Sequence, residues 1–347
     1  CDAGLAPKTM QHPEFAGHTN YAYHLDAVKF ARLLTRHATE KLGVKHLLGT
    51  VHQVQLNDSG DIGAVWTREH GPVSADMFID CTGFSALLIG DTFQIPFIEK
   101  NDVMFVDRAL AVQVPYADQQ QPIPCYTIAT AREAGWIWDI GLSARRGTGY
   151  VYSSRYTTDD RAEQVLRDYL QGAADGLSLR KIEMKVGYRE KFWHRNCIAL
   201  GLSQGFVEPL EATGLLIYDA TARMLAELFP PHQAAVALLA ERFNQRVRLA
   251  WDKVIDFIKL HYYLSDRDDS DFWRDNRDVA SVPASLLANL QQWRYQVPSA
   301  YDFHSKLEVF NLENYLYVMY GMGFQTDLQG QAAGQCAGVG RVRRRGS

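Results

Sequence analysis

The chain has 347 residues, of which 47% are hydrophobic and 22% charged, an ordinary composition for a globular protein. This length usually needs more than one core, so we expect a large α/β body with an appended smaller unit. The net charge of -4 is too small to indicate nucleic acid or an anionic membrane as a partner. The five cysteines show no metal-ligand spacing and no disulfide framework, and no apolar run is long enough to span a membrane. These features favour a cytoplasmic protein without a metal site.

The first segment with a clear period is a helix at 26–43. Its apolar side chains recur at helical spacing, Asp26 can cap its start, and Gly43 can end it. Three strand-like runs follow, at 44–56, 61–68 and 75–80. The turn sequence Asn-Asp-Ser-Gly at 57–60 predicts that the first two form a hairpin.

The rest of the chain is first β-rich and then helical. Residues 103–116 and 123–157 are β-rich, and Gly147 and Gly149 are predicted bulge or turn points. We expect helices at 160–172, 214–228, 232–262 and 311–320, and extended chain at 180–200. The predicted division is therefore a sheet-rich domain at 1–230, a helical unit at 231–328 and a disordered tail at 329–347.

The most informative motif is Gly-Leu-Ser-Gln-Gly-Phe-Val-Glu-Pro-Leu-Glu-Ala-Thr-Gly at 201–214. It follows an apolar strand and precedes an apolar helix, so unpaired backbone N–H groups and the positive end of the helix dipole are expected at the turn. Such a helix start can hold an anion or an electron-rich cofactor edge. Spacing alone does not decide between this and a capped helix with two acidic neighbours, Glu208 and Glu211.

This motif resembles a signature of the flavin-dependent tryptophan halogenases, and three further segments do so in the same order. These segments are Tyr-Ala-Tyr-His-Leu-Asp-Ala at 21–27, Phe-Ile-Asp-Cys-Thr-Gly-Phe at 78–84 and His-Tyr-Tyr-Leu-Ser-Asp-Arg-Asp-Asp-Ser-Asp-Phe-Trp at 261–273. The resemblance extends from about residue 18 to 325. It implies a flavin monooxygenase-like FAD-binding α/β fold, incomplete at the N-terminus, with a mostly helical C-terminal unit over the substrate.

The resemblance also implies roles for individual residues. Glu211 matches the active-site glutamate, which stabilises the cationic arene intermediate and accepts its proton. Thr213 and Gly214 match the halide site, and Pro209 and Phe310 match substrate positions. Positions beside the cofactor are matched by Val51, Thr82, Gly83, Leu202 and Leu215. For Val51, a plain core position remains an equal alternative.

The implied activity is halogenation of tryptophan or another indole with reduced FAD, dioxygen and chloride or bromide. A separate NADH-dependent flavin reductase supplies the reduced flavin in this scheme. The match around Phe310 is loose, so a peptide or larger indole substrate is left open, as is a homodimer.

Three departures from the family pattern matter. The family motif Trp-x-Trp-x-Ile-Pro reads here as Trp136-Ile-Trp-Asp-Ile-Gly141, and glycine is more flexible than proline. No Gly-x-Gly-x-x-Gly phosphate loop occurs, and neither Lys8 nor Lys29 matches the essential family lysine. We therefore expect an N-terminally truncated member that is inactive as given; an aromatic monooxygenase and a non-catalytic relic are the alternatives.

Overall fold

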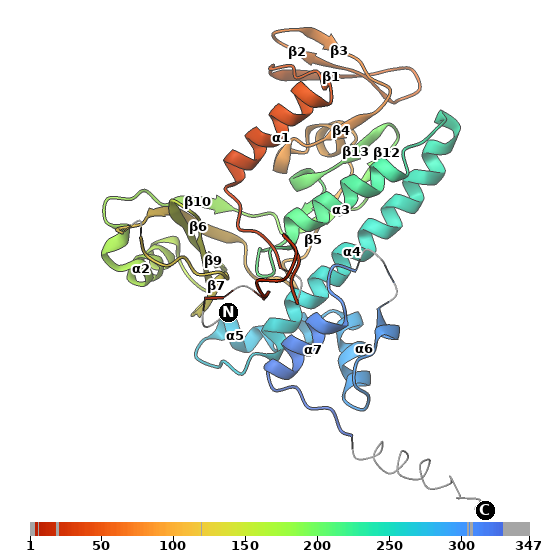
Figure 1. Cartoon of the computed structure of the whole chain (residues 1–347). Helices are drawn as coiled ribbons and strands as arrows, with labels where there is room; N and C mark the ends of the chain where they lie inside the picture. The colour runs from red at the N-terminus through yellow and green to blue at the C-terminus, as the bar shows by residue number, and fades with distance from the viewer. Residues whose placement is uncertain are drawn as a thin grey trace, which may run out of the picture.

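The computed structural model describes residues 4–5, 7–18, 21–118, 120–303, 305 and 308–328. The predicted tail at 329–347 lies outside these residues. Figure 1 shows α1 and the first strands at one end of the molecule and the C-terminal helices at the other, with α4 running between them. No helix in the described ranges is long and apolar enough to cross a membrane.

The predicted N-terminal helix is confirmed as α1 (Ala27–Lys41). The Asp26 carboxylate accepts hydrogen bonds from the backbone N–H groups of Val28 and Lys29, both at 3.1 Å, as an N-cap does. Gly43 adopts φ +69° just beyond the helix end. None of the side chains of α1 is buried, so the apolar face that made the helix predictable is open.

A small antiparallel sheet follows α1, in the order β1-β2-β3. Its strands are β1 (Val51–Leu56), β2 (Ile62–Thr67) and β3 (Gly71–Val73). The predicted hairpin is confirmed, with Gly60 at φ +83° in its turn. The first strand begins at Val51 rather than at residue 44, and β3 was not predicted.

Two parallel strands at the centre of the molecule come from distant parts of the chain. β4 (Phe78–Asp80) pairs in parallel with β13 (Cys197–Ala199), and β12 (Trp193–His194) lies on the other side of β13. A second small sheet joins β5 (Phe97–Glu99), β11 (Gly187–Arg189) and β14 (Gly205–Phe206). The chain leaves β4 through a 3₁₀ turn, η1 (Gly83–Ser85), and a π-helix, η2 (Leu87–Thr92).

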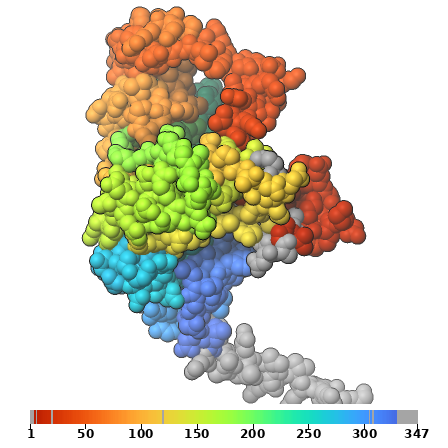
Figure 2. All heavy atoms as spheres, turned by 90° about the vertical axis from the view of Figure 1, so that its left-hand side faces the viewer, coloured from red at the N-terminus to blue at the C-terminus, as the bar shows by residue number. Residues whose placement is uncertain are grey.

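The largest sheet has five strands in the order β10-β6-β9-β8-β7. They are β6 (Arg108–Pro115), β7 (Ile128–Arg132), β8 (Gly135–Gly141), β9 (Arg145–Tyr152) and β10 (Arg180–Glu183). One face packs against α2 (Asp159–Leu170), which Thr158 caps, and the other faces the main core. In Figure 2 this sheet and α2, coloured yellow to green, lie between the orange N-terminal part and the blue helices.

The prediction that Gly147 and Gly149 form bulges or turns is wrong. Both lie inside β9 and pair in regular register with β8 and β6. Gly149 lies directly opposite Trp138, and a Cβ on Gly149 would come within 2.2 Å of the indole ring. Glycine is needed at this position because the ring lies across it.

The helices complete the structure. They are α3 (Thr213–Glu227), α4 (Val236–Leu264), α5 (Asp271–Asn276), α6 (Ala284–Trp293) and α7 (Leu312–Gly321). Short 3₁₀ segments also occur in this half of the chain. η3 (Gln171–Ala174) follows α2, η4 (Gly201–Ser203) precedes α3, and η5 (Gln233–Ala235), η6 (Val279–Ser281) and η7 (Ala300–Asp302) lie between the later helices. The main core contains buried residues from both sides of position 230, where we predicted a domain boundary.

Candidate functional site

The predicted cofactor residues of the central sheet meet where β4 and β13 end. η1 and η4 lie side by side there, which brings Thr82 and Gly83 close to Leu202. The Leu200 N–H donates to the Asp80 carbonyl at 3.0 Å and so joins the two strand ends. In open α/β sheets, ligands bind outside the carboxyl ends of parallel strands.

Two glycines leave room beside these turns. Gly83 and Gly201 have φ values of +73° and +71°, which side chains rarely adopt, and a Cβ on either would meet no described atom within 4 Å. A flat ring can therefore approach the backbone of both turns.

Helix α3 begins next to η4 without a side-chain cap. Ala212 occupies the N-cap position in the left-handed conformation, with φ 52°, and has no side-chain oxygen to accept from the first N–H groups. The Thr213 hydroxyl is buried and has no hydrogen-bond partner among the described residues. Leu215, in the first turn, is 71% exposed. The capped-helix alternative therefore loses its support, and the helix start is free to meet an anion.

Glu211 forms an ion pair across the site. Its Oε1 lies 2.8 Å from Nε2 of His261 on α4. The other ring nitrogen of His261, Nδ1, lies 2.9 Å from the Phe257 carbonyl oxygen. A carbonyl only accepts, so a hydrogen bond at this nitrogen has Nδ1–H as its donor and leaves Nε2 to face Glu211.

A second carboxylate lies wholly inside the protein. Oε2 of Glu208 accepts hydrogen bonds from the Trp136 indole N–H and from the Tyr262 hydroxyl, each at 2.6 Å. Burial raises the pKa of Glu208 to about 7, against the lowering effect of the two hydrogen bonds. Lys259 lies on α4, the helix that carries Tyr262. Burial lowers the pKa of Lys259 to about 7, and its Nζ donates a hydrogen bond to Asn276 at 2.9 Å.

The glycine that replaces the family proline has a steric cause. A Cβ on Gly141 would come within 2.5 Å of the Ile123 side chain and 3.2 Å of the Tyr116 hydroxyl. Nδ1 of His24 lies 3.3 Å from the Gly141 carbonyl oxygen. At the start of the same strand, Trp136 is 4% exposed and therefore firmly held.

The remaining predicted residues are spread over the molecule. Pro209 is exposed beside Glu208, whereas Phe310 is buried and stacks on Phe257 with ring centroids 3.9 Å apart. Val51 lies in the separate β1-β2-β3 sheet. Cys81, between the end of β4 and Thr82, is exposed.

Sequence reasoning assigned no role to His261, Tyr262 or Lys259. The sequence did contain a partial indication of their importance, because His261 and Tyr262 are the first two residues of one of the four family segments. Their side-chain partners, Glu211, Glu208 and Asn276, lie outside α4, so spacing within the helix could not identify them.

A large cleft in the described part of the chain lies elsewhere. It has a volume of about 1530 Å³ and runs between the β1–β2 turn, residues 190–196 and the beginning of α4. None of the predicted site residues lines it. We base the site on the strand ends and the start of α3, where the polar groups converge.

The fold and these strand ends define the class of protein. A crystal structure of a tryptophan halogenase from Shewanella frigidimarina NCIMB 400 matches with a TM-score of 0.91 and 45% identity, over 97% of this chain and 65% of that chain. Tar14, a tryptophan C-6 flavin-dependent halogenase from taromycin biosynthesis, matches with a TM-score of 0.88 and 37% identity, over 94% and 66%. The chain therefore has the mixed α/β fold of flavin-dependent halogenases.

The sequence comparisons identify the family. Residues 2–337 match the tryptophan halogenase family, and the chain belongs to it. Tryptophan 6-halogenase SttH of Streptomyces toxytricini is 37% identical, over 93% of this chain and 65% of its own length. Tryptophan 7-halogenase RebH of Lentzea aerocolonigenes is 35% identical, over 94% and 63%. The chain thus spans just under two thirds of the length of these curated relatives.

Proposed function

We propose that this chain contributes the substrate-facing part of a flavin-dependent halogenase that acts on tryptophan or another indole. The observation that carries the proposal is the Glu211–His261 pair beside the uncapped start of α3. The names of its relatives, tryptophan 6- and 7-halogenases, support the substrate class. A separate NADH-dependent flavin reductase is the proposed source of reduced flavin.

The residues present fit FAD and a halide. Thr82, Gly83 and Leu202 would lie along the flavin, because the backbone beside both glycines is open. The N–H groups of Thr213 and Gly214 would hold chloride or bromide at the positive end of α3. When bound, the reduced flavin supplies, with dioxygen and the halide, an electrophilic halogen.

Glu211 performs the proton chemistry in this proposal. Its carboxylate stabilises the positive charge that appears on the ring when the halogen adds, and then accepts the proton from the same carbon. His261 holds Glu211 in place through Nε2, while the Phe257 carbonyl fixes the orientation of the imidazole. The proton that Glu211 accepts can then pass to Nε2 of His261 and leave through the imidazole, whose side chain is 19% exposed.

Flavin affinity is expected to need more than this chain. The sequence has no Gly-x-Gly-x-x-Gly loop to surround a pyrophosphate with backbone N–H groups. We therefore propose that the chain alone binds FAD weakly and turns over no substrate. Activity tests accordingly use this chain joined to a segment that supplies a phosphate loop and the family lysine, and we call the joined chain the full-length protein.

The substitution Glu211→Gln tests the function. It keeps the size of the side chain and removes the base, so we expect halogenated product to fall by on the order of a hundredfold. Product is measured with the parent protein and the variant at equal flavin loading. Asp219→Asn, further along α3 and exposed, is the matched control. Equal yields from the parent and Glu211→Gln would remove the assigned role.

A further inference from the structure

One buried oxygen atom joins three segments that lie far apart in the sequence. Oε2 of Glu208 accepts from Trp136 on β8 and from Tyr262 on α4, and Glu208 itself lies in the turn before α3. All three side chains are buried. Breaking either bond would leave a polar group unsatisfied in the core, so the contact fixes the distances between the three segments.

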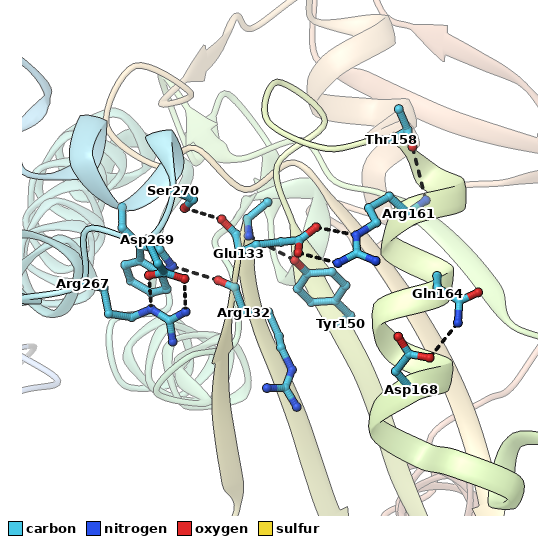
Figure 3. A network of polar contacts seen from close by, with 12 residues as sticks. Arg132, Glu133, Tyr150, Thr158, Arg161, Gln164, Asp168, Arg267, Asp269 and Ser270 are labelled. Atoms are coloured by element: carbon cyan, nitrogen blue, oxygen red, sulfur yellow. Dashed lines mark hydrogen bonds and ion pairs between the residues drawn. The ribbon is translucent and has the colours of Figure 1, made fainter.

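The segment after α4 also holds the backbone at the start of β8. Ser270 Oγ donates to the Glu133 carbonyl at 2.5 Å, and Trp273 Nε1 donates to the Arg132 carbonyl at 2.8 Å. Figure 3 shows Ser270 reaching Glu133 in the turn between β7 and β8, with Arg161 of α2 on the opposite side. Arg161 pairs with the Glu133 carboxylate at 2.7 Å. The turn is therefore held on both sides, and β8 enters the core from a fixed point.

We infer that Glu208 is a positioning residue of the proposed site, which acts as a hydrogen-bond acceptor to hold the Glu211 turn at a fixed distance from the tryptophan strand β8. The inference rests on the proposed function. Glu211 follows Glu208 by three residues, and Pro209 lies between them. A shift of about 1 Å in a reacting group can cost on the order of a hundredfold in rate, so this link affects turnover without touching substrate.

The acceptor, rather than the negative charge, is the property that the geometry uses. Both donors are uncharged groups, and both converge on the same oxygen. The other oxygen, Oε1, has no partner in the described ranges, so an amide nitrogen in its place breaks no existing hydrogen bond. Lys259 lies in the same core and favours the charged form of Glu208 through space, but its Nζ donates its hydrogen bond to Asn276. A glutamine should therefore keep both bonds.

The first test does not depend on turnover. Indole N–H signals are recorded by NMR for the parent protein and for Glu208→Gln, Glu208→Leu and Tyr262→Phe, with Trp136→Phe to assign the signal of Trp136. We expect this signal to move strongly in Glu208→Leu, clearly in Tyr262→Phe and least in Glu208→Gln. Tyr263→Phe is the matched control, because the Tyr263 hydroxyl has no hydrogen bond among the described residues. An unmoved signal in Glu208→Leu would overturn the link.

The second test separates positioning from general stability. In the full-length protein, Glu208→Leu should lower kcat by on the order of tenfold to a hundredfold, with KM for the indole changed much less. Glu208→Gln should lose no more than about fivefold, since it keeps the acceptor. If Glu208→Gln loses as much as Glu208→Leu, the charge matters and the inference is wrong. Should Glu208→Leu fail to fold, Tyr262→Phe replaces it in this test. It removes only one donor, so its kcat should also fall, but by less. A parent protein that makes no halogenated product would refute the proposed function, while the NMR result would still decide the link.

Discussion

Substitution of Gly149 by alanine tests the packing that places the second tryptophan of β8. The added Cβ would lie 2.2 Å from two indole atoms of Trp138 and 2.4 Å from the Leu110 carbonyl oxygen. Ordinary carbon contacts are about 3.5–4.0 Å, so atoms on both sides must move. The Leu110 oxygen belongs to the backbone of β6 and cannot rotate away, so we expect about 3 kcal/mol of destabilisation, the upper end for overpacking.

Gly147 provides a matched control two residues earlier in the same strand. A Cβ there meets no described atom within 4 Å, so Gly147→Ala should be neutral or gain about 0.4–1 kcal/mol from the less flexible unfolded chain. At roughly 2–4 °C per kcal/mol, the two variants should differ by about 6–16 °C in Tm. Thermal unfolding followed by circular dichroism measures this, and the indole N–H signal of Trp138 should shift only in Gly149→Ala. Equal melting temperatures for the two variants would refute the close approach of ring and backbone.

Two further predictions concern the halide site and the buried carboxylate. Gly214→Pro removes a backbone donor in the first turn of α3, where proline is tolerated, and should weaken apparent chloride affinity roughly tenfold to a hundredfold. Gly214→Ala keeps the N–H, and the nearest atoms to its Cβ belong to Tyr218, at 3.7 Å, so its half-saturating chloride concentration should match that of the parent. If this concentration rises equally in Gly214→Pro and Gly214→Ala, the halide binds elsewhere. Because burial raises the pKa of Glu208 from 4.5 to about 7, the folded protein keeps a proton that the unfolded chain releases, and this stabilisation is lost as the pH rises through that range. The loss is at most about 1.4 kcal/mol per pH unit. Melting temperatures measured across that range should fall less in Glu208→Gln than in the parent, and parallel curves would contradict the shift.

Local patterns made much of the fold predictable. The cap at Asp26, the turn at 57–60 and the apolar spacing of α4 each depend on neighbours within a few residues. The start of α3 was predictable for the same reason. These features need no knowledge of which segments meet.

Long-range contacts could not be predicted, because they depend on which distant segments meet in the fold. Gly149 looked like a bulge because glycine weakens a strand, but Trp138, eleven residues away, requires it. Glu208 looked like one of two acidic residues before a helix, and its donors lie 72 and 54 residues away. A single sequence shows the residue types, but it does not show which side chains contact one another in the fold and so what role each one has.

Helix α1 has a consequence for how this surface behaves. It is 15 residues long, none of its side chains is buried, and Leu33 and Leu34 are each 51% exposed. An isolated helix of that length is marginal in water, so its persistence depends on contact with its apolar face. For a polypeptide that binds to that face, binding and ordering of α1 would be coupled, and the entropy lost by the helix would lower the binding affinity. Amide hydrogen exchange along Ala27–Lys41 becomes a direct gauge of occupancy: fast when the face is bare and slow when it is covered.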